Sequence, residues 1–345
     1  MRAVAVFEPG KVGIVEIPAP RPGSYEALVK SEIAYICNAT DRKVVGGHFP
    51  GMGREAYPLL LGHETVGRVV EIGSKVRSFA VGDRVLGGLL ISPVGFGSGW
   101  GGDSEYVLAA DHEAMVADGA AVAEQGWFET CEIMRKVPED IPLEAAGLLA
   151  TWREVYAAFS DFRLGRGDEI LVFGAGPVGL SFCRLAKLLG LGWVGVVDTL
   201  AFKRERALAL GADAVFAPDD PAIGGLEATR GRKLDAVVDA VGSERVIDSG
   251  LPLVRMAGSI CVYGVLGGDS LTIAKSKGPY NFNVFVHQWP TRSAEAAAQA
   301  PLVEWIREGK LRWQDFKTGE FPIGEIEAAL AATEAPTSIK TMLRF

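Results

Sequence analysis

The chain has 345 residues, of which 48% are hydrophobic and 23% are charged, as in a globular protein large enough for two domains. Its formal net charge of −8 at pH 7 argues against a nucleic acid or an anionic membrane as a partner. The sequence contains no apolar run of about 18 residues, so we expect no transmembrane helix. We expect no signal peptide either, because the apolar stretch after Met1 is short.

The four cysteines are scattered along the chain, and two of them, Cys183 and Cys261, lie within apolar segments. Disulfides persist mainly in oxidising compartments, and a small secreted domain held by disulfides would show a denser pattern. We therefore expect free thiols, including those of Cys37 and Cys131, and a cytoplasmic location.

Short predicted strands, separated by glycine and proline, fill the first 110 residues. They include a first strand near Met1 and strands at residues 27–33 and 66–72, and the glycine-rich stretch 87–102 is expected to be a loop. This pattern predicts a β-rich, Greek-key or barrel-like domain. Residues 111–143 are predicted to form a connecting insertion with one or two short helices.

The pattern changes at about residue 150, where short apolar strands begin to alternate with helices. A strand at 169–173 is followed by a helix at 178–189, whose apolar residues recur at helical spacing and which Gly190 ends. The alternation of strands and helices predicts a parallel, doubly wound sheet. The further elements are a strand at 193–197, a helix at 203–210, and strands at 214–216, 235–239 and 259–263.

Two helices, at 294–309 and 323–333, and a strand at 339–345 complete the chain. We expect this last segment to return to the first domain. The predicted domains are therefore a catalytic β-rich domain at 1–148, a dinucleotide-binding domain at 149–290, and a C-terminal return at 291–345.

A dinucleotide-binding loop is predicted after the strand at 169–173, because a G-x-G-x-x-G pattern there precedes a helix. Gly174 permits the tight turn, Gly176 lets the backbone approach a pyrophosphate, and Gly179 allows close packing of helix and strand. Asp198 follows at the spacing of a carboxylate that binds a ribose 2′-hydroxyl, which favours NAD over NADP. The alternative is a tight turn without a ligand. The predicted cofactor-binding set is Gly174, Gly176, Pro177, Val178, Gly179, Asp198, Lys203 and Val241.

A metal site is predicted from Cys37, His63 and Glu64, which are three side chains that can bind zinc. The glycines after Glu64 would let a tightly turned sheet bring backbone close to the ion. Taken singly, Cys37 could be a buried thiol and His63 a hydrogen-bonded core residue. A metal and a dinucleotide in one protein together suggest hydride transfer at a carbon whose oxygen the metal polarises.

The whole chain resembles the medium-chain dehydrogenase/reductase superfamily, in its zinc-dependent alcohol and polyol dehydrogenase branch. The matching stretches are Gly62 to Val85, residues 101–107 and residues 168–179, and the match is weakest at 111–143. The resemblance implies a split GroES-like catalytic domain around a Rossmann domain. It also implies that Cys37 and His63 bind the catalytic zinc, and that Glu64 binds it or lies just behind it. Asp41 would orient His63, and Thr40 would relay the alcohol proton.

Three features depart from the family pattern. Four closely spaced cysteines near residues 90–110 are missing, so we expect one catalytic zinc and no structural zinc. Asp41 stands four residues after Cys37 instead of three. The roles that the family pattern would give to Ala39, Thr40 and Lys43 could therefore belong to residues one position away. Ala150 and Thr151 stand where the family supplies a further ligand, and Glu154 or a water molecule is the alternative. The predicted catalytic residues are Thr40, Lys43 and Glu64, and the predicted metal ligands are Cys37, His63, Glu64 and Glu154.

The resemblance implies reversible, NAD-linked oxidation of a secondary alcohol to a ketone. Polar residues around the expected cleft favour a polyol, sugar or cyclitol, although the three basic ones could equally form a solvated loop. His112 and His287 are expected to be structural or surface residues. The expected cleft residues are Asn38, Arg42, Lys43, His48, Trp152, Arg153 and Glu154, with Trp289 and Arg292 at its edge.

Two other functions stay open at this point. The first is a zinc-free reductase of the same superfamily that acts on quinones or enones, which the missing further ligand favours. The second is a dinucleotide-binding structural or regulatory protein without turnover. The resemblance further implies a homo-oligomer, dimer or tetramer, because such folds commonly pair through the edge of the Rossmann sheet.

Overall fold

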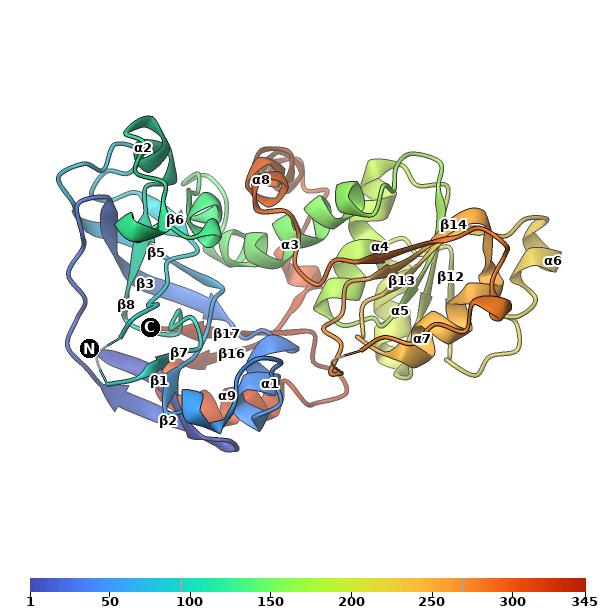
Figure 1. Cartoon of the computed structure of the whole chain (residues 1–345), viewed down its shortest axis with the longest axis horizontal. Coiled ribbons are helices and arrows are strands. Elements are labelled where there is room, and N and C mark those ends of the chain that lie inside the picture. Colours follow the sequence, from blue (N-terminus) through green and yellow to red (C-terminus); the bar gives the residue numbers. More distant parts are fainter. Residues whose placement is uncertain (94, 269) are drawn as a thin grey trace. The chain divides into compact units, whose positions relative to one another are not determined.

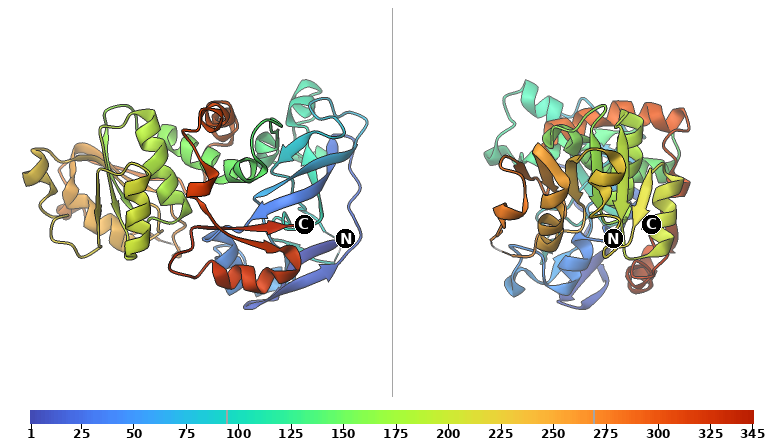
Figure 2. Two further views of the ribbon diagram at one scale, coloured as in Figure 1. Left: turned by 180° about the vertical axis from the view of Figure 1, so that it is seen from behind. Right: turned by 90° about the vertical axis from the view of Figure 1, so that its right-hand side faces the viewer.

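The computed structural model describes residues 1–93, 95–268 and 270–345 and divides into two compact units. Unit 1 contains Met1–Ala150 and Gln299–Phe345, and unit 2 contains Thr151–Ala298. The C-terminal segment therefore belongs to the same unit as the first residues, and Figure 2 shows both chain termini there. The catalytic and coenzyme-binding roles assigned to the predicted domains stay predictions.

The larger sheet of unit 1 is organised around β3 (Glu26–Tyr35). This strand pairs antiparallel with β5 (Thr65–Ile72), β8 (Tyr106–Ala110) and β17 (Lys340–Arg344). Strand β17 thus brings the end of the chain beside β3 (Figure 1). The outer strands of this sheet are β6 (Arg84–Leu86), β9 (Arg135–Lys136) and β16 (Lys317–Pro322).

A smaller sheet of unit 1 runs in the order β2-β1-β4-β7. The predicted loop at 87–102 contains one of its strands, which pairs parallel with β4, and Val94 in that loop lies outside the described residues. Helices α1 (Thr40–Gly46) and α9 (Ile326–Ala332) contribute Val44 and Ile326 to the core beside this sheet. The four strands are β1 (Arg2–Glu8), β2 (Lys11–Glu16), β4 (Leu59–Leu60) and β7 (Gly97–Ser98).

The insertion at 111–143 contains α2 (His112–Ala117) and two 3-10 helices, Ala123–Gln125 and Glu129–Ile133. Asp111 is the N-cap of α2, and its carboxylate accepts the Ala114 N–H. Cys131 and Met134 are buried in the core of unit 1. The predicted short helices are confirmed, and apolar contacts attach this segment to the unit's own core.

Unit 2 is built on a sheet of six described strands in the order β12-β11-β10-β13-β14-β15. Every neighbouring pair is parallel, and the order reverses between β10 and β13, as in a Rossmann sheet. The predicted α/β fold with a doubly wound sheet is confirmed. The strands are β10 (Glu169–Phe173), β11 (Trp193–Val197), β12 (Ala214–Phe216), β13 (Leu234–Asp239), β14 (Val254–Val262) and β15 (Asn283–Val286).

Helices flank this sheet (Figure 1). Helix α4 (Pro177–Leu189) has proline at its first position and ends at Gly190, whose left-handed backbone lets its N–H bond the last carbonyls of the helix. Helix α4 packs on β10 and β11, and α7 packs on β13 and β14. Helix α7 contains Glu244–Gly250, and the other helices of unit 2 are α5 (Ala201–Ala209) and α6 (Leu226–Arg230). Helices α3 (Leu143–Asp161) and α8 (Arg292–Arg307) each have residues in both units. Among the described residues, each helix is too short or too polar to span a lipid bilayer.

Candidate active site

The turn between β10 and α4 is closely packed at two of its three glycines. Gly174 has φ of +95°, and a Cβ atom added there would lie 2.8 Å from Val241 Cγ2. A Cβ atom on Gly179 would lie 1.8 Å from the carbonyl oxygen of Gly174, so only glycine fits. By contrast, nothing lies within 4 Å of a Cβ atom built on Gly176. This open space lies directly before the first turn of α4.

The N-terminus of α4 can accept an anion. Gly176 is its N-cap and has no side chain to bond the first N–H groups, and Pro177 and Val178 follow in the first turn. Unsatisfied N–H groups and the helix dipole together favour a phosphate at such a position.

Asp198 lies directly after β11 and is held beside the glycine turn. Its Oδ2 accepts the Ala175 N–H at 2.7 Å, and its Oδ1 accepts the Leu200 N–H at 2.9 Å. The Arg204 guanidinium donates to the carbonyl oxygens of Asp198 and Thr199. The structure thus brings Asp198 to the glycine turn, and it places Lys203 in α5.

Asp239 is a residue that the sequence analysis missed. Its buried carboxylate accepts the N–H groups of Val241 and Gly242 at Oδ1 and of Ser243 at Oδ2. These hydrogen bonds fix the conformation of the loop that places Val241 beside Gly174. The sequence did contain a signal for this role, namely an aspartate at the end of a buried strand with a glycine soon after it.

The predicted metal ligands of unit 1 lie together. One ligand atom each from Cys37, His63 and Glu64 lies within 4.8 Å of the others. Cys37 follows β3, and His63 and Glu64 precede β5, so the antiparallel pairing of these strands brings the three side chains together. A thiolate, an imidazole and a carboxylate are the donors that zinc prefers, so this group fits a zinc ion.

Asp41 supports two of these residues. Its Oδ2 accepts the backbone N–H of Cys37 at 2.7 Å, and its Oδ1 lies 3.4 Å from His63 Nδ1. Because Asp41 lies in the first turn of α1, the extra residue after Cys37 still leaves its carboxylate beside His63. This arrangement turns Nδ1 of His63 toward Asp41 and leaves Nε2 as its other possible ligand atom.

The charges around His63 favour its protonated form in the metal-free protein. Burial opposes protonation, but Asp41 and then Cys37 outweigh burial and raise the pKa of His63 well above its usual value. A divalent ion would compete with this proton for the imidazole.

Lys340 is a second residue that the sequence analysis missed. Its ammonium donates to Glu64 Oε1 at 2.6 Å, and both side chains are buried. A lysine within the mostly apolar segment Ile339 to Leu343 was the signal, because a buried lysine requires an acidic partner.

Two more unpredicted residues lie near the cluster. The Trp100 ring meets the His63 ring edge-on at a centroid distance of 5.3 Å, and its φ of +71° is unusual for a non-glycine residue. Asp103 is fully buried, and burial, reinforced by the charge of Asp41, raises the pKa of its carboxyl group well above the usual value.

The other predicted residues of unit 1 lie on or near α1. Thr40 is buried in its first turn, and Lys43 is partly buried in its last turn. Arg42 forms an ion pair with Glu334, and His48 is exposed. The proton-relay and catalytic roles of Thr40 and Lys43 stay predictions.

The predicted residues of unit 2 differ more from expectation. Trp152 and Arg153 are 0% and 1% exposed, so the prediction that they line a cleft is wrong. Arg153 lies in a buried charge cluster with Glu295, and Glu295 also binds Arg292. Glu154 accepts a hydrogen bond from the Tyr263 hydroxyl at 3.4 Å, and its role as a metal ligand stays a prediction.

His112 and Trp289 complete the predicted set, together with His287. His112 Nδ1 accepts the indole N–H of Trp127 at 3.0 Å, which is a structural contact. His287 lies 3.9 Å from Asp161, and Trp289 is 37% exposed.

Two domain families match the chain. The alcohol dehydrogenase GroES-like domain matches residues 23–121, and the zinc-binding dehydrogenase family matches residues 177–287. The first match includes the Cys37 cluster, and the second begins at the first residue of α4.

Several known proteins are similar in sequence. A probable zinc-binding alcohol dehydrogenase of Mycobacterium tuberculosis is 33% identical over 273 residues, which are 77% of this chain and 68% of that protein. An NADP-dependent isopropanol dehydrogenase of Thermoanaerobacter brockii is 30% identical over 80% of this chain and 79% of its own length. A sorbitol dehydrogenase of Halalkalibacterium halodurans is 26% identical over 97% of this chain and 96% of its own length.

Solved structures agree on the fold. An Escherichia coli alcohol dehydrogenase complexed with NADH matches with a TM-score of 0.79 at 22% identity, over 100% of this chain and 99% of that chain. A 2R,3R-butanediol dehydrogenase of Bacillus subtilis matches with a TM-score of 0.78 at 20% identity, over 100% and 99% of the two chains. Together with the matching families and the 33% identity, these findings confirm the resemblance: the chain belongs to the zinc-dependent medium-chain dehydrogenase superfamily.

Proposed function

We propose that the chain uses one zinc ion and NAD to oxidise a secondary alcohol, namely a polyol, sugar or cyclitol, reversibly to a ketone. The observation that carries the proposal is the group of Cys37, His63 and Glu64 in a chain that also has the glycine turn predicted to bind a dinucleotide. Zinc at such a site supplies a Lewis acid that makes the alcohol more acidic, and NAD accepts the hydride.

The chain's own residues prepare the site for a cation. Cys37 would bind as a thiolate, and His63 would bind through Nε2 while Nδ1 faces Asp41. Lys340 holds the Glu64 carboxylate, so Glu64 can act as a ligand or remain just behind the ion. Thr40 is the proposed first acceptor of the alcohol proton, with Lys43 as the neighbouring candidate.

The preference for NAD is supported by Asp198. Its carboxylate is held at the glycine turn, where it can accept hydrogen bonds from a ribose diol but would repel a 2′-phosphate. The Ala175 N–H donates to Oδ2 and the Leu200 N–H to Oδ1, so the carboxylate cannot rotate away without losing two hydrogen bonds.

The polyol class is supported by polar side chains that lie close in sequence to the proposed metal ligand Cys37. Asn38 follows Cys37 directly, and Arg42, Lys43 and His48 lie on or after α1. The sorbitol dehydrogenase among the similar proteins is consistent with this class. A homo-oligomer is also proposed, because the edge strand β15 presents Val286, which is 49% exposed.

The test follows NADH absorbance over a panel of sugars, polyols, cyclitols and simple alcohols, with zinc measured on the same sample. Turnover of a secondary alcohol with one zinc per chain is the expected result. Equal turnover by metal-free and zinc-loaded protein, or reduction of enones without zinc, would instead support the zinc-free reductase. NADH binding without turnover of any panel member would support a non-catalytic protein.

A further inference from the structure

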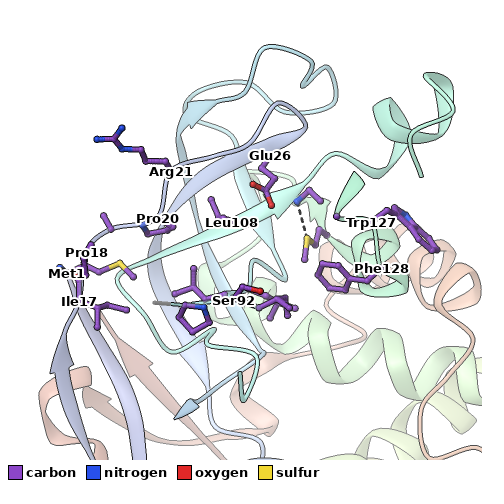
Figure 3. A pocket seen from close by; sticks show the side chains of 18 of the residues that line it. Met1, Ile17, Pro18, Pro20, Arg21, Glu26, Ser92, Leu108, Trp127 and Phe128 are labelled. Carbon is purple, nitrogen blue, oxygen red and sulfur yellow. Dashed lines mark hydrogen bonds between the residues drawn. The ribbon is translucent and has the colours of Figure 1, made fainter. Parts of the chain in front are cut away.

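Unit 1 contains a cavity of about 690 Å³ that the proposed active site does not use (Figure 3). This volume lies within the range of about 300–1,000 Å³ that is typical of small-molecule sites. All of its lining residues belong to unit 1, and they include none of the predicted metal ligands or coenzyme-binding residues. The cavity is therefore a separate candidate binding site.

Apolar side chains form most of the wall. Ile17, Leu108, Trp127 and Phe128 line the cavity and are only partly buried, although each packs against the core of unit 1. Leu90 lines it from the core itself. Partly exposed apolar surface in a concave site favours a ligand that removes it from water.

One carboxylate interrupts this apolar wall. Glu26, the first residue of β3, lines the cavity, and Figure 3 shows its side chain between the wall near Ile17 and the wall formed by Trp127 and Phe128. Its Oε2 accepts the Gly23 N–H at 2.8 Å, which fixes the group and leaves Oε1 available as an acceptor. The charge of Glu26 also reaches the interior: after burial, it helps to raise the pKa of the Cys131 thiol to about 11.

Among the residues that line the cavity, Met1 and Arg21 carry positive groups, and neither forms an ion pair with Glu26. The Arg21 side chain points away from the cavity in Figure 3. The amino group of Met1 donates to the carbonyl oxygen of Ile17 at 2.7 Å, at the wall away from Glu26. No ion pair of Glu26 occurs among residues 1–93, 95–268 and 270–345.

We propose that this cavity binds a small organic cation, with an ammonium head at Glu26 and an apolar body between Ile17, Trp127 and Phe128. A carboxylate beside aromatic rings is the chemistry that recognises such ions, since both the charge and the ring faces attract a cation. A neutral ligand of the same shape would keep only the apolar contacts. An anion would meet the carboxylate and bind least well.

Isothermal titration calorimetry with three probes of one shape tests the proposal: 4-butylbenzylammonium, 4-butylbenzamide and 4-butylbenzoate. We expect one equivalent of the ammonium ion to bind about tenfold or more tightly than the amide, with the benzoate weakest. Equal affinity for the ammonium ion and the benzoate, or no heat from any probe with folded protein, would overturn the proposal.

Variants locate the site. Glu26→Gln keeps an oxygen that can accept the Gly23 N–H, so we expect a folded protein that binds the ammonium ion about tenfold more weakly and the amide unchanged. Trp127→Ala should weaken all three probes. Glu71→Gln, at an exposed position of β5 outside the cavity, is the matched control and should bind like the parent. Unchanged affinity of Glu26→Gln for the ammonium ion would refute the assignment, whatever the dehydrogenase assay shows.

Discussion

The Nζ atom of Lys340 lies 2.6 Å from Oε1 of Glu64, although 276 residues separate them in the chain. Burial alone would lower the pKa of Lys340, but the charges of Glu64 and Cys37 outweigh it and raise that pKa. The lysine therefore keeps its proton while buried. Strand β17 thus supplies a fixed positive charge to the candidate metal-binding group.

Removal of this charge should destabilise the metal-free protein. We expect Lys340→Met to lower the free energy of unfolding by about 3–5 kcal/mol, because the buried Glu64 carboxylate would lose its lysine partner. Urea unfolding in the presence of a chelator measures the change. The double variant Glu64→Gln/Lys340→Met should recover much of the loss, and a loss below about 1 kcal/mol in the single variant would contradict the role of the pair.

Zinc binding should depend on Cys37 and His63. We expect Cys37→Ala and His63→Ala to lose both bound zinc and alcohol oxidation while they retain NADH binding, because the proposed coenzyme turn lies in unit 2. Metal content and NADH titration on one sample check both parts. Cys183→Ala, which removes a buried thiol of unit 2, is the control and should keep its zinc. Full zinc occupancy in either ligand variant would rule out the assigned site.

Zinc affinity should fall as the pH falls. Burial opposes protonation of His63, but Asp41 and Cys37 raise its pKa well above the usual value, so the metal-free imidazole holds a proton over more of the pH range. Zinc needs the neutral ring, so affinity should be full above this raised pKa and should decrease as the pH drops through it. Competition with a chromogenic chelator at several pH values measures the midpoint.

Asp41→Asn should separate two effects of that carboxylate, namely its influence on the pKa of His63 and its orientation of the His63 ring. We expect the midpoint to move to lower pH, because the main group that raises the pKa of His63 loses its charge. At high pH, zinc affinity should still fall by about 10–100-fold through the loss of ring orientation. An unchanged midpoint would show that Asp41 does not control His63.

The three glycines of the coenzyme turn should respond differently to alanine. Gly176→Ala meets open space, so we expect unfolding stability within about 0.5 kcal/mol of the parent but a higher KM for the coenzyme. Gly179→Ala places a Cβ atom against the Gly174 carbonyl, and we expect a loss of about 1–3 kcal/mol or more. Thermal unfolding and coenzyme kinetics distinguish the two. A normal KM in a folded Gly176→Ala variant would place the pyrophosphate elsewhere.

Asp198→Ala should relax the coenzyme preference. Loss of the carboxylate removes the ribose contact and the repulsion of a 2′-phosphate, so we expect the NAD/NADP ratio of kcat/KM to fall about tenfold or more. Steady-state kinetics with both coenzymes measure the ratio. Asp219→Ala, at an exposed position of unit 2, is the control. If Asp198→Ala leaves the ratio unchanged, the ribose assignment is wrong.

Much of unit 2 could be predicted from the sequence because its signals are local. The apolar strand Glu169–Phe173, the glycines after it and the left-handed cap at Gly190 each act within a few residues. Ligand chemistry likewise identified Cys37, His63 and Glu64 as candidates, since few residue types bind zinc. These features can be predicted because residues that are adjacent in sequence determine them.

The tertiary structure decided which distant groups meet. Lys340 reaches Glu64 only because β17 pairs with β3, and no local pattern states which strand will be the neighbour. The same holds for Arg153, whose charge suggested a cleft but which is buried with Glu295. A buried charge is stable only beside its partner, and the fold alone determines where that partner lies.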